Sequence, residues 1–366
     1  MADTDNPVRD SLLRLGIEAE RMGLPHIASS WSEGVPAFSS SGGHSAGTGQ
    51  DYRTAAMNRS SLSTLALMTS TALALAAAEP AWQPLWDKAP GPALQEQADQ
   101  SRDNGEHISR IVRPEIQVFA PDAAKPAAAR PALVVLPGGG YGILAVRKEG
   151  SEIAQWAAAQ GMVGVVVKYR VTDRAGDGYQ FPVPLMDARR AIRTVRHRAA
   201  EWGVDPNRIG IIGFSAGGHL AAMATTLWNE PLEGETGDAI DKASARPDFG
   251  VLVYPVIAID QPYGHAGSRK NLLGENPDPA LVARCCPARK LAKDTPPLCL
   301  IHAADDPVSC LNSFDMARAA KEHGVPLAFH LFENGGHGFG LRKQGKAADA
   351  WPEAVAAWMA NRKILP

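Results

Sequence analysis

The sequence predicts an α/β fold in which a mostly parallel sheet carries helices on both faces. Short runs such as Ala132–Leu136 and Leu298–His302 are apolar at nearly every position, which is typical of parallel strands covered on both sides. Amphipathic segments of helical period, such as Leu185–Trp202, lie between these runs. Strands that alternate with helices in this way indicate a parallel sheet.

The elements follow one another along the chain. The predicted strands are Ile116–Phe119 at the sheet edge, Ala132–Leu136, Val163–Lys168, a strand that ends in Ile209–Ile212, Phe249–Pro255, Leu298–His302 and Phe329–Phe332. The predicted helices are Gly150–Gln160, Leu185–Trp202, one that begins just after Ser215, Leu311–His323 and Ala350–Lys363. Five arginines between positions 189 and 198 fit the period of the second helix, so we expect them on a solvated face.

The 366 residues divide into four parts by composition. Residues 1–56 form an N-terminal extension that contains a long Ser/Gly-rich stretch, a composition that predicts disorder. Residues 57–78 are like a signal peptide, and residues 79–110 form an extended lead-in. Residues 111–366 form the α/β domain, in which we expect the chemistry.

The segment 57–78 has a basic start, an apolar middle and the small-residue pair Ala76-x-Ala78, the three parts of a secretory signal. If Met57 is the natural start, residues 1–56 lie upstream of it and the protein is secreted or periplasmic. The alternative is an ordinary Ala/Leu-rich helix in a cytoplasmic protein. Threonines and serines interrupt the apolar run, so we expect no stable membrane span.

Charge and cysteine content exclude several other classes. The formal net charge is −2, from 37 basic and 39 acidic residues, so nothing indicates nucleic-acid binding. The four cysteines lack CxxC and zinc-type spacing, and they predict neither a disulfide scaffold nor a metal site. The pair Cys285–Cys286 has no functional interpretation, and we predict no cofactor.

The motif Gly213-x-Ser215-x-Gly217 follows a predicted strand and precedes a predicted helix, the context of a nucleophile elbow. On such a sharp turn the residues two positions away must be small. The serine hydroxyl then lies at a helix N-terminus, where free N–H groups and the helix dipole favour negative charge. The alternative is an ordinary strand–helix turn.

A serine needs a base, and the base needs a carboxylate to orient it. Elbow hydrolases carry these residues in the order Ser, Asp or Glu, His. That order predicts His337, in a glycine-rich loop, as the base and Asp306 as the acid, with the adjacent Asp305 as the alternative acid. His219 lies on the helix directly after the serine, so we expect it to pack locally.

The loop Pro137–Gly142 follows a predicted strand and supplies candidate oxyanion donors. We predict that the backbone N–H groups of Gly139, Gly140 and Ala216 form the oxyanion hole. The loop lacks the spacing of a phosphate-binding motif. Glu149, which follows it, is expected to serve the N-terminus of the next helix.

Four motifs together resemble the α/β-hydrolase esterases, in particular the bacterial acetyl-xylan-esterase-like carbohydrate esterases, which are relatives of the hormone-sensitive-lipase type. They are Pro137–Tyr141, Gly213–Leu220, His302–Val308 and Gly335–Phe339. The resemblance implies Ser215 as nucleophile, Asp306 as acid, His337 as base, and Gly139, Gly140 and Ala216 as the oxyanion hole. The chain departs from the pattern at Pro137, where the lipase-like relatives have histidine, and at Ser309–Cys310, where related esterases usually have Val-Pro.

These observations predict a serine carboxylesterase that forms an acyl-enzyme. Polar, Gly/Asp-rich loops at Thr172–Tyr179, Asn229–Arg246 and Ile259–Arg269 suit a small-molecule or carbohydrate ester, such as an acetylated sugar. A serine peptidase of the same fold and a non-catalytic carbohydrate-binding relative are the alternatives.

Overall fold

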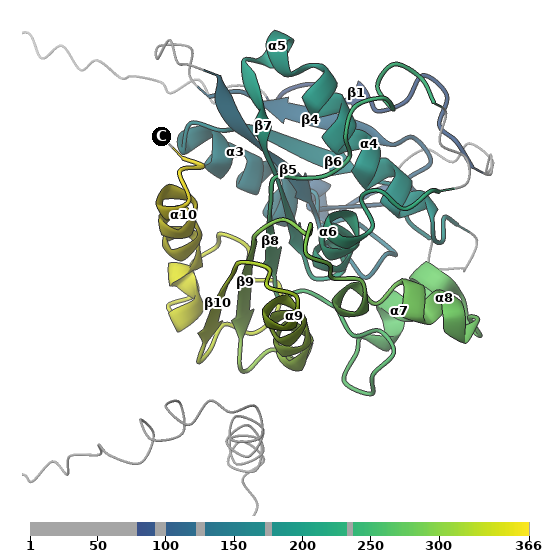
Figure 1. Ribbon diagram of the computed structural model, residues 1–366, viewed down its shortest axis with the longest axis vertical. Helices are drawn as coiled ribbons and strands as arrows, with labels where there is room; N and C mark the ends of the chain where they lie inside the picture. Colours follow the sequence, from purple (N-terminus) through teal and green to yellow (C-terminus); the bar gives the residue numbers. More distant parts are fainter. Residues whose placement is uncertain (1–78, 92–99, 122–128, 173–177, 233–236, 366) are drawn as a thin grey trace, which may run out of the picture. The chain divides into compact units, whose positions relative to one another are not determined.

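A mostly parallel sheet runs through the protein, as predicted (Figure 1). The computed structural model describes residues 79–91, 100–121, 129–172, 178–232 and 237–365. The predicted extension 1–56 and the signal-like segment 57–78 lie outside these residues.

Within the described residues the sheet has eight strands, in the order β1-β4-β6-β5-β7-β8-β9-β10. In this sheet only the pairs β1–β4 and β4–β6 are antiparallel. The strands are β1 (Gln83–Pro84), β4 (Glu115–Phe119), β5 (Arg130–Leu136), β6 (Val163–Lys168), β7 (Val204–Phe214), β8 (Phe249–Val253), β9 (Leu298–Ala303) and β10 (Leu327–Phe332). A separate ribbon pairs β2 (Gln100–Arg102) with β3 (His107–Ser109).

Helices cover both faces of the sheet (Figure 1). They are α3 (Glu152–Ala159), α4 (Val183–His197), α5 (Ala199–Trp202), α6 (Ala216–Thr226), α7 (Ala266–Leu273), α8 (Pro279–Arg284), α9 (Leu311–Glu322) and α10 (Trp351–Asn361). A π-helical turn, Arg147–Ser151, precedes α3. Short 3-10 turns span Asp103–Gly105, Pro287–Arg289 and Ala347–Ala350.

Alternate residues of each strand enter opposite cores. On β5, Val134 packs with the cluster that includes residues of α4, α6 and α9, whereas Leu133 and Val135 pack with residues of α3 and α10. This alternation follows from the pleat of a strand, which points successive side chains to opposite faces. Both clusters are apolar, which explains why the strands read as unbroken apolar runs.

The lead-in is part of the folded unit. Its β1 pairs with β4. The prediction that Ile116–Phe119 forms the edge strand is therefore wrong, because β1 lies outside β4. Leu85 and Trp86 are buried, and the indole Nε1 of Trp86 donates to Asp187 Oδ1 at 2.9 Å.

The prediction that the arginines of α4 lie on a solvated face is wrong. Arg189 and Arg190 are each only 2% exposed. Arg190 donates to carboxylates of Asp238 and Asp241, and Arg189 donates to the carbonyl of Glu230 at 2.6 Å. A loop from a distant part of the chain covers this face, and helical periodicity cannot reveal such a cover.

None of the helices in the described part of the chain is both long and apolar enough to cross a membrane.

Candidate active site

Ser215 lies on the sharp turn between β7 and α6. Its backbone has φ 53° and ψ −118°, a strained conformation for a residue with a side chain. Three backbone hydrogen bonds hold the turn: Ser215 N–H donates to Val253 O at 3.0 Å, and the N–H groups of His219 and Val256 donate to Ser215 O at 3.0 and 3.1 Å. Ser215 is only 9% exposed, so little of the residue is accessible to solvent.

The two glycines of the motif are required by close backbone contacts. A Cβ on Gly213 would lie 2.1 Å from the carbonyl oxygen of Gly217, and a Cβ on Gly217 would lie 2.2 Å from that of Leu136. Atoms cannot approach so closely without moving the backbone. The spacing of the motif therefore reflects how tightly α6 packs against β7 and the end of β5.

The structure brings Ser215, His337 and Asp306 together. His337 Nε2 lies 2.9 Å from Ser215 Oγ. Its other ring nitrogen, Nδ1, lies 2.9 Å from each carboxylate oxygen of Asp306. These three residues come from the ends of β7, β9 and β10, which are the carboxyl ends of parallel strands.

The two adjacent aspartates contact different groups. Asp306 contacts His337 and also accepts from Val308 N–H at 2.7 Å. Asp305 Oδ1 instead accepts from the N–H groups of Gly335 and Gly336, at 2.8 and 2.7 Å. Asp305 therefore anchors the loop that carries the histidine, while Asp306 contacts the imidazole itself.

The environment of Asp306 favours its charged form. Burial acts to raise the pKa of this carboxyl group, but hydrogen bonds with His302 and His337 outweigh it and lower the pKa below the ordinary value. His302 is fully buried, and its Nε2 lies 3.5 Å from Asp306 Oδ2. The sequence analysis placed His302 at the end of a predicted strand and in the motif His302–Val308, but it assigned this residue no role in the site.

The glycine loop after β5 packs directly on the elbow. A Cβ on Gly138 would lie 2.7 Å from Phe214 O and 3.0 Å from Ser215 Cβ. Ala216 is the first residue of α6, so its N–H has no acceptor within the helix. The carbonyl of Gly140 accepts from the side-chain amide of Asn271 at 2.8 Å, which ties the loop to α7.

The prediction that His219 packs locally is wrong, because its ring contacts two segments that are distant in the sequence. Its Nδ1 lies 2.8 Å from the hydroxyl of Tyr141, and its Nε2 lies 2.8 Å from the carbonyl oxygen of Cys285. Complete burial lowers the pKa of His219 to about 4, so the ring is neutral at neutral pH. A neutral ring donates from Nε2 to the carbonyl and accepts at Nδ1 from Tyr141. The Cys285–Cys286 segment thus has a structural contact through its backbone.

Two further residues contact the loops of the site, and the sequence analysis did not assign them to it. Glu149 contacts the glycine loop, and Tyr254 contacts the loop that carries His337, called here the histidine loop. Glu149 is 4% exposed, and its Oε2 accepts from Gly138 N–H at 2.9 Å. Tyr254 is fully buried, donates to Glu149 Oε1 at 2.8 Å and accepts from Gly340 N–H at 3.2 Å. The prediction that Glu149 serves only a helix terminus missed these contacts, because Gly138 and Tyr254 lie on other segments.

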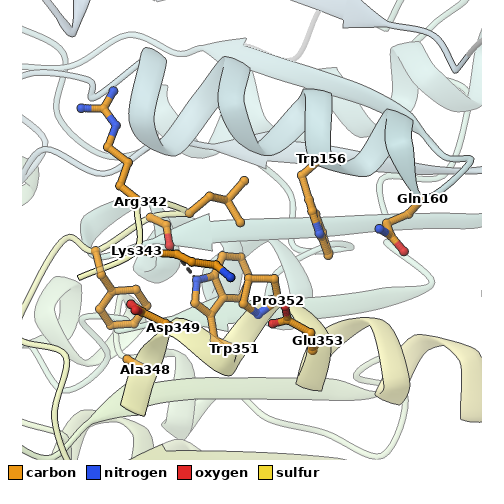
Figure 2. Close-up of a pocket in the computed structure, with 12 residues that line it drawn as sticks. Trp156, Gln160, Arg342, Lys343, Ala348, Asp349, Trp351, Pro352 and Glu353 are labelled. Carbon is orange, nitrogen blue, oxygen red and sulfur yellow. Dashed lines mark hydrogen bonds between the residues drawn. The ribbon is translucent and has the colours of Figure 1, made fainter. Parts of the chain in front are cut away.

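A pocket of about 380 Å³ lies between α3 and the chain that follows the histidine loop (Figure 2). Trp156 and Gln160 line one side, and residues from Phe339 to Glu353 line the other. Ser215, Asp306 and His337 are not among its lining residues. The buried Trp351 of this pocket donates from Nε1 to Gly340 O at 2.6 Å, which fixes the backbone just after the loop that carries His337.

Among the described residues, no group of His, Cys, Asp and Glu side chains is arranged to hold a metal ion. All four cysteines are free thiols, and burial raises the pKa of Cys285, Cys286 and Cys299 to about 12.

A serine on the turn between a central strand and a helix of a mostly parallel sheet is characteristic of the α/β-hydrolase fold. Solved esterases of this fold are similar to the chain. The acetyl ester-xyloside bifunctional hydrolase of Caldicellulosiruptor lactoaceticus is 35% identical, with a TM-score of 0.66 over 79% of this chain and 100% of that one. An esterase of Thermogutta terrifontis with bound propionate is 28% identical, with a TM-score of 0.58 over 69% of this chain and 91% of that one.

The chain belongs to the BD-FAE family, whose sequence profile matches residues 116–318. The acetylxylan esterase of Xylanibacter ruminicola is 34% identical over 234 residues, 62% of this chain and 45% of that protein. Esterase LipQ of Mycobacterium tuberculosis is 28% identical over 228 residues, 58% of this chain and 52% of that protein. The chain thus spans about half the length of these curated relatives. The fold and the esterase resemblance inferred from the motifs are both confirmed.

Proposed function

We propose that this protein is a serine carboxylesterase that hydrolyses short-chain acyl esters, including acetyl groups on carbohydrate. The observation that carries the proposal is the continuous chain of contacts from Ser215 Oγ through His337 to Asp306, with 2.9 Å at each step. Distances of this size allow direct proton transfer from the serine to the imidazole.

In the proposed reaction, Ser215 Oγ attacks the ester carbonyl carbon while His337 Nε2 takes the hydroxyl proton. The Asp306 carboxylate accepts the Nδ1–H hydrogen bond and stabilises the imidazolium. The N–H groups of Ala216, Gly139 and Gly140 stabilise the oxyanion. His337 then protonates the leaving alcohol, and an acyl-serine remains. Water, deprotonated by the same imidazole, releases the acid and restores Ser215.

The acetylxylan esterase and the acetyl ester-xyloside hydrolase among the relatives support an acetyl ester of a polar alcohol as substrate. Polar side chains beside the glycine loop also support it. A Cβ built on Gly140 would lie 3.9 Å from His265 Cε1 and 4.0 Å from Ser268 Oγ. His265 is exposed, and its Nδ1 accepts from the backbone N–H of Ser268 at 3.1 Å. The ring proton is therefore on Nε2, which can donate a hydrogen bond to solvent or substrate.

The direct test measures hydrolysis of p-nitrophenyl acetate by the wild-type protein and by Ser215→Ala. We expect the alanine variant to lose turnover by several orders of magnitude, while the control Ser244→Ala, at an exposed serine, stays at the wild-type rate. Rates should fall as the acyl chain is lengthened from acetate, and acetylated xylan should release acetate. Turnover of an aminoacyl p-nitroanilide in preference to esters would favour the peptidase alternative, and no Ser215-dependent turnover would favour a non-catalytic relative.

We also propose that the signal-like segment 57–78 directs export. Its basic start, apolar middle and Ala76-x-Ala78 pair support this. In a native-like host, the secreted or periplasmic protein should begin at Glu79. A mature protein that begins at Met1 or Ala2 would contradict the proposal.

A further inference from the structure

We propose that Glu149 and Tyr254 form a positioning pair that holds the glycine loop and the histidine loop in the relative arrangement needed for ester hydrolysis. This inference rests on the proposed function, because the two loops carry the candidate oxyanion donors and the candidate base. Neither residue is assigned a part in the triad or in the oxyanion hole.

Glu149 holds the glycine loop through a hydrogen bond to its backbone. Its Oε2 accepts from Gly138 N–H at 2.9 Å, immediately before the proposed donors Gly139 and Gly140. The carboxylate approaches so closely that a Cβ on Gly138 would lie 2.6 Å from Oε2. Glu149 itself lies in a π-helical turn, a rare local structure that is common at functional sites.

Tyr254 holds the histidine loop. Its hydroxyl accepts from Gly340 N–H at 3.2 Å, three residues after His337. Its ring lies 4.9 Å from the His337 ring and 4.5 Å from the Phe339 ring, centre to centre. The tyrosine therefore contacts the base directly and also fixes the backbone beyond it.

The Tyr254–Glu149 hydrogen bond, 2.8 Å long, joins the two loops into one buried network. Burial and the nearby Glu149 carboxylate raise the pKa of Tyr254 well above its ordinary value, so the hydroxyl remains a donor. Each atom of the network then has a matching partner: Glu149 accepts at two different oxygens, and the tyrosine hydroxyl donates once and accepts once.

The network needs a carboxylate and a phenol. Glutamine has one carbonyl oxygen. If that oxygen stays with Gly138 N–H, the NH₂ group faces the Tyr254 hydroxyl, whose proton then has no acceptor in a buried site. If the oxygen turns to Tyr254 instead, the NH₂ group meets Gly138 N–H and the glycine loop loses its acceptor. Phenylalanine at position 254 would keep the ring on His337. It would leave the Gly340 N–H and one oxygen of Glu149 without partners in a buried site. Either change should let one loop shift relative to the other.

The test compares Glu149→Gln, Tyr254→Phe and the double variant with the wild-type enzyme. We expect kcat for p-nitrophenyl acetate to fall about 10- to 100-fold in each single variant, because a misplacement of reacting groups by up to about 1 Å can cost up to about 100-fold in rate. KM should change little, since the substrate contacts remain. Affinity for a phenylboronic acid, which forms a tetrahedral anion on the serine, should weaken by a similar factor. The double variant should lose little more than either single variant, because the two residues act as one unit.

One variant serves as a matched control. Glu152→Gln changes a carboxylate three residues away that pairs with Arg342. It should keep wild-type kcat and boronic-acid affinity. Melting temperatures are recorded for every variant, and if Glu149→Gln does not fold, the Tyr254→Phe measurements decide the question.

The proposal is overturned if kcat stays within about 2-fold of wild type, if boronic-acid affinity is unchanged while kcat falls, or if the two substitutions act additively. A wild-type protein without Ser215-dependent turnover would overturn the proposed function as well. An active wild-type enzyme with normal variants would overturn only the positioning role.

Discussion

Replacing Asp306 and Asp305 separately by asparagine should have very different effects on turnover, although the two residues are adjacent and identical. Asp306 contacts His337 Nδ1 through both oxygens, and Oδ1 also accepts from Val308 N–H. In Asp306→Asn the oxygen stays with Val308, so the NH₂ group faces Nδ1. The imidazole must then accept at Nδ1 and carry its proton on Nε2, where it can no longer take the proton of Ser215.

The expected loss in kcat is about 10⁴-fold, the size of the effect that a wrong imidazole tautomer has in a serine-protease triad. This corresponds to about 5.5 kcal/mol of transition-state stabilisation. Asp305→Asn should behave differently. Both of its bonds, to the N–H groups of Gly335 and Gly336, end on Oδ1, which an asparagine retains. Only charge assistance is lost, so kcat should fall by about 10-fold or less.

The assay is steady-state hydrolysis of p-nitrophenyl acetate at pH 8, with a thermal melt of each variant to show that it is folded. Equal losses in the two variants would refute the assignment of separate roles. So would a folded Asp306→Asn enzyme whose kcat remains within about 10-fold of wild type.

Three further predictions concern stability. Because the pKa of His219 falls from 6.5 to about 4 on folding, the unfolded state binds the proton first and stability is lost as pH falls between these values. The free energy of unfolding, measured in urea, should be about 3 kcal/mol lower at acid pH. If that free energy fell with pH as steeply in His219→Asn as in the wild type, His219 would not be the cause. Asp187→Asn, which weakens the fully buried pair with Arg170, should lower stability by about 3 to 5 kcal/mol; a loss below about 1 kcal/mol would show that the pair is dispensable. Gly217→Ala, whose Cβ would meet a backbone oxygen at 2.2 Å, should unfold at least about 1 to 3 kcal/mol more easily. Gly203→Asn, at φ 63° in open space, should fold normally, and equal losses in the two glycine variants would refute the steric argument.

The sequence by itself determined the fold and the order of the candidate chemical groups. Apolar runs and helical periods are local consequences of how strands and helices bury their faces, so they predict each element without knowledge of its neighbours. The elbow is equally local, because Gly213 and Gly217 are needed within five residues of chain to let backbone atoms meet. His337 and the Asp305–Asp306 pair could be proposed because each follows a predicted strand, and parallel strands bring their carboxyl ends to one edge.

Only the tertiary structure decided which groups actually touch. Which of Asp305 and Asp306 reaches the imidazole depends on the direction in which each side chain leaves the turn and on the position of the histidine loop. The arginines of α4 are buried because a distant loop supplies Asp238 and Asp241. Glu149 meets Tyr254 across 105 residues of sequence. A hydrogen bond needs its two atoms within about 3 Å and well aligned, and only the packing of the whole sheet fixes separations of that size between segments so far apart.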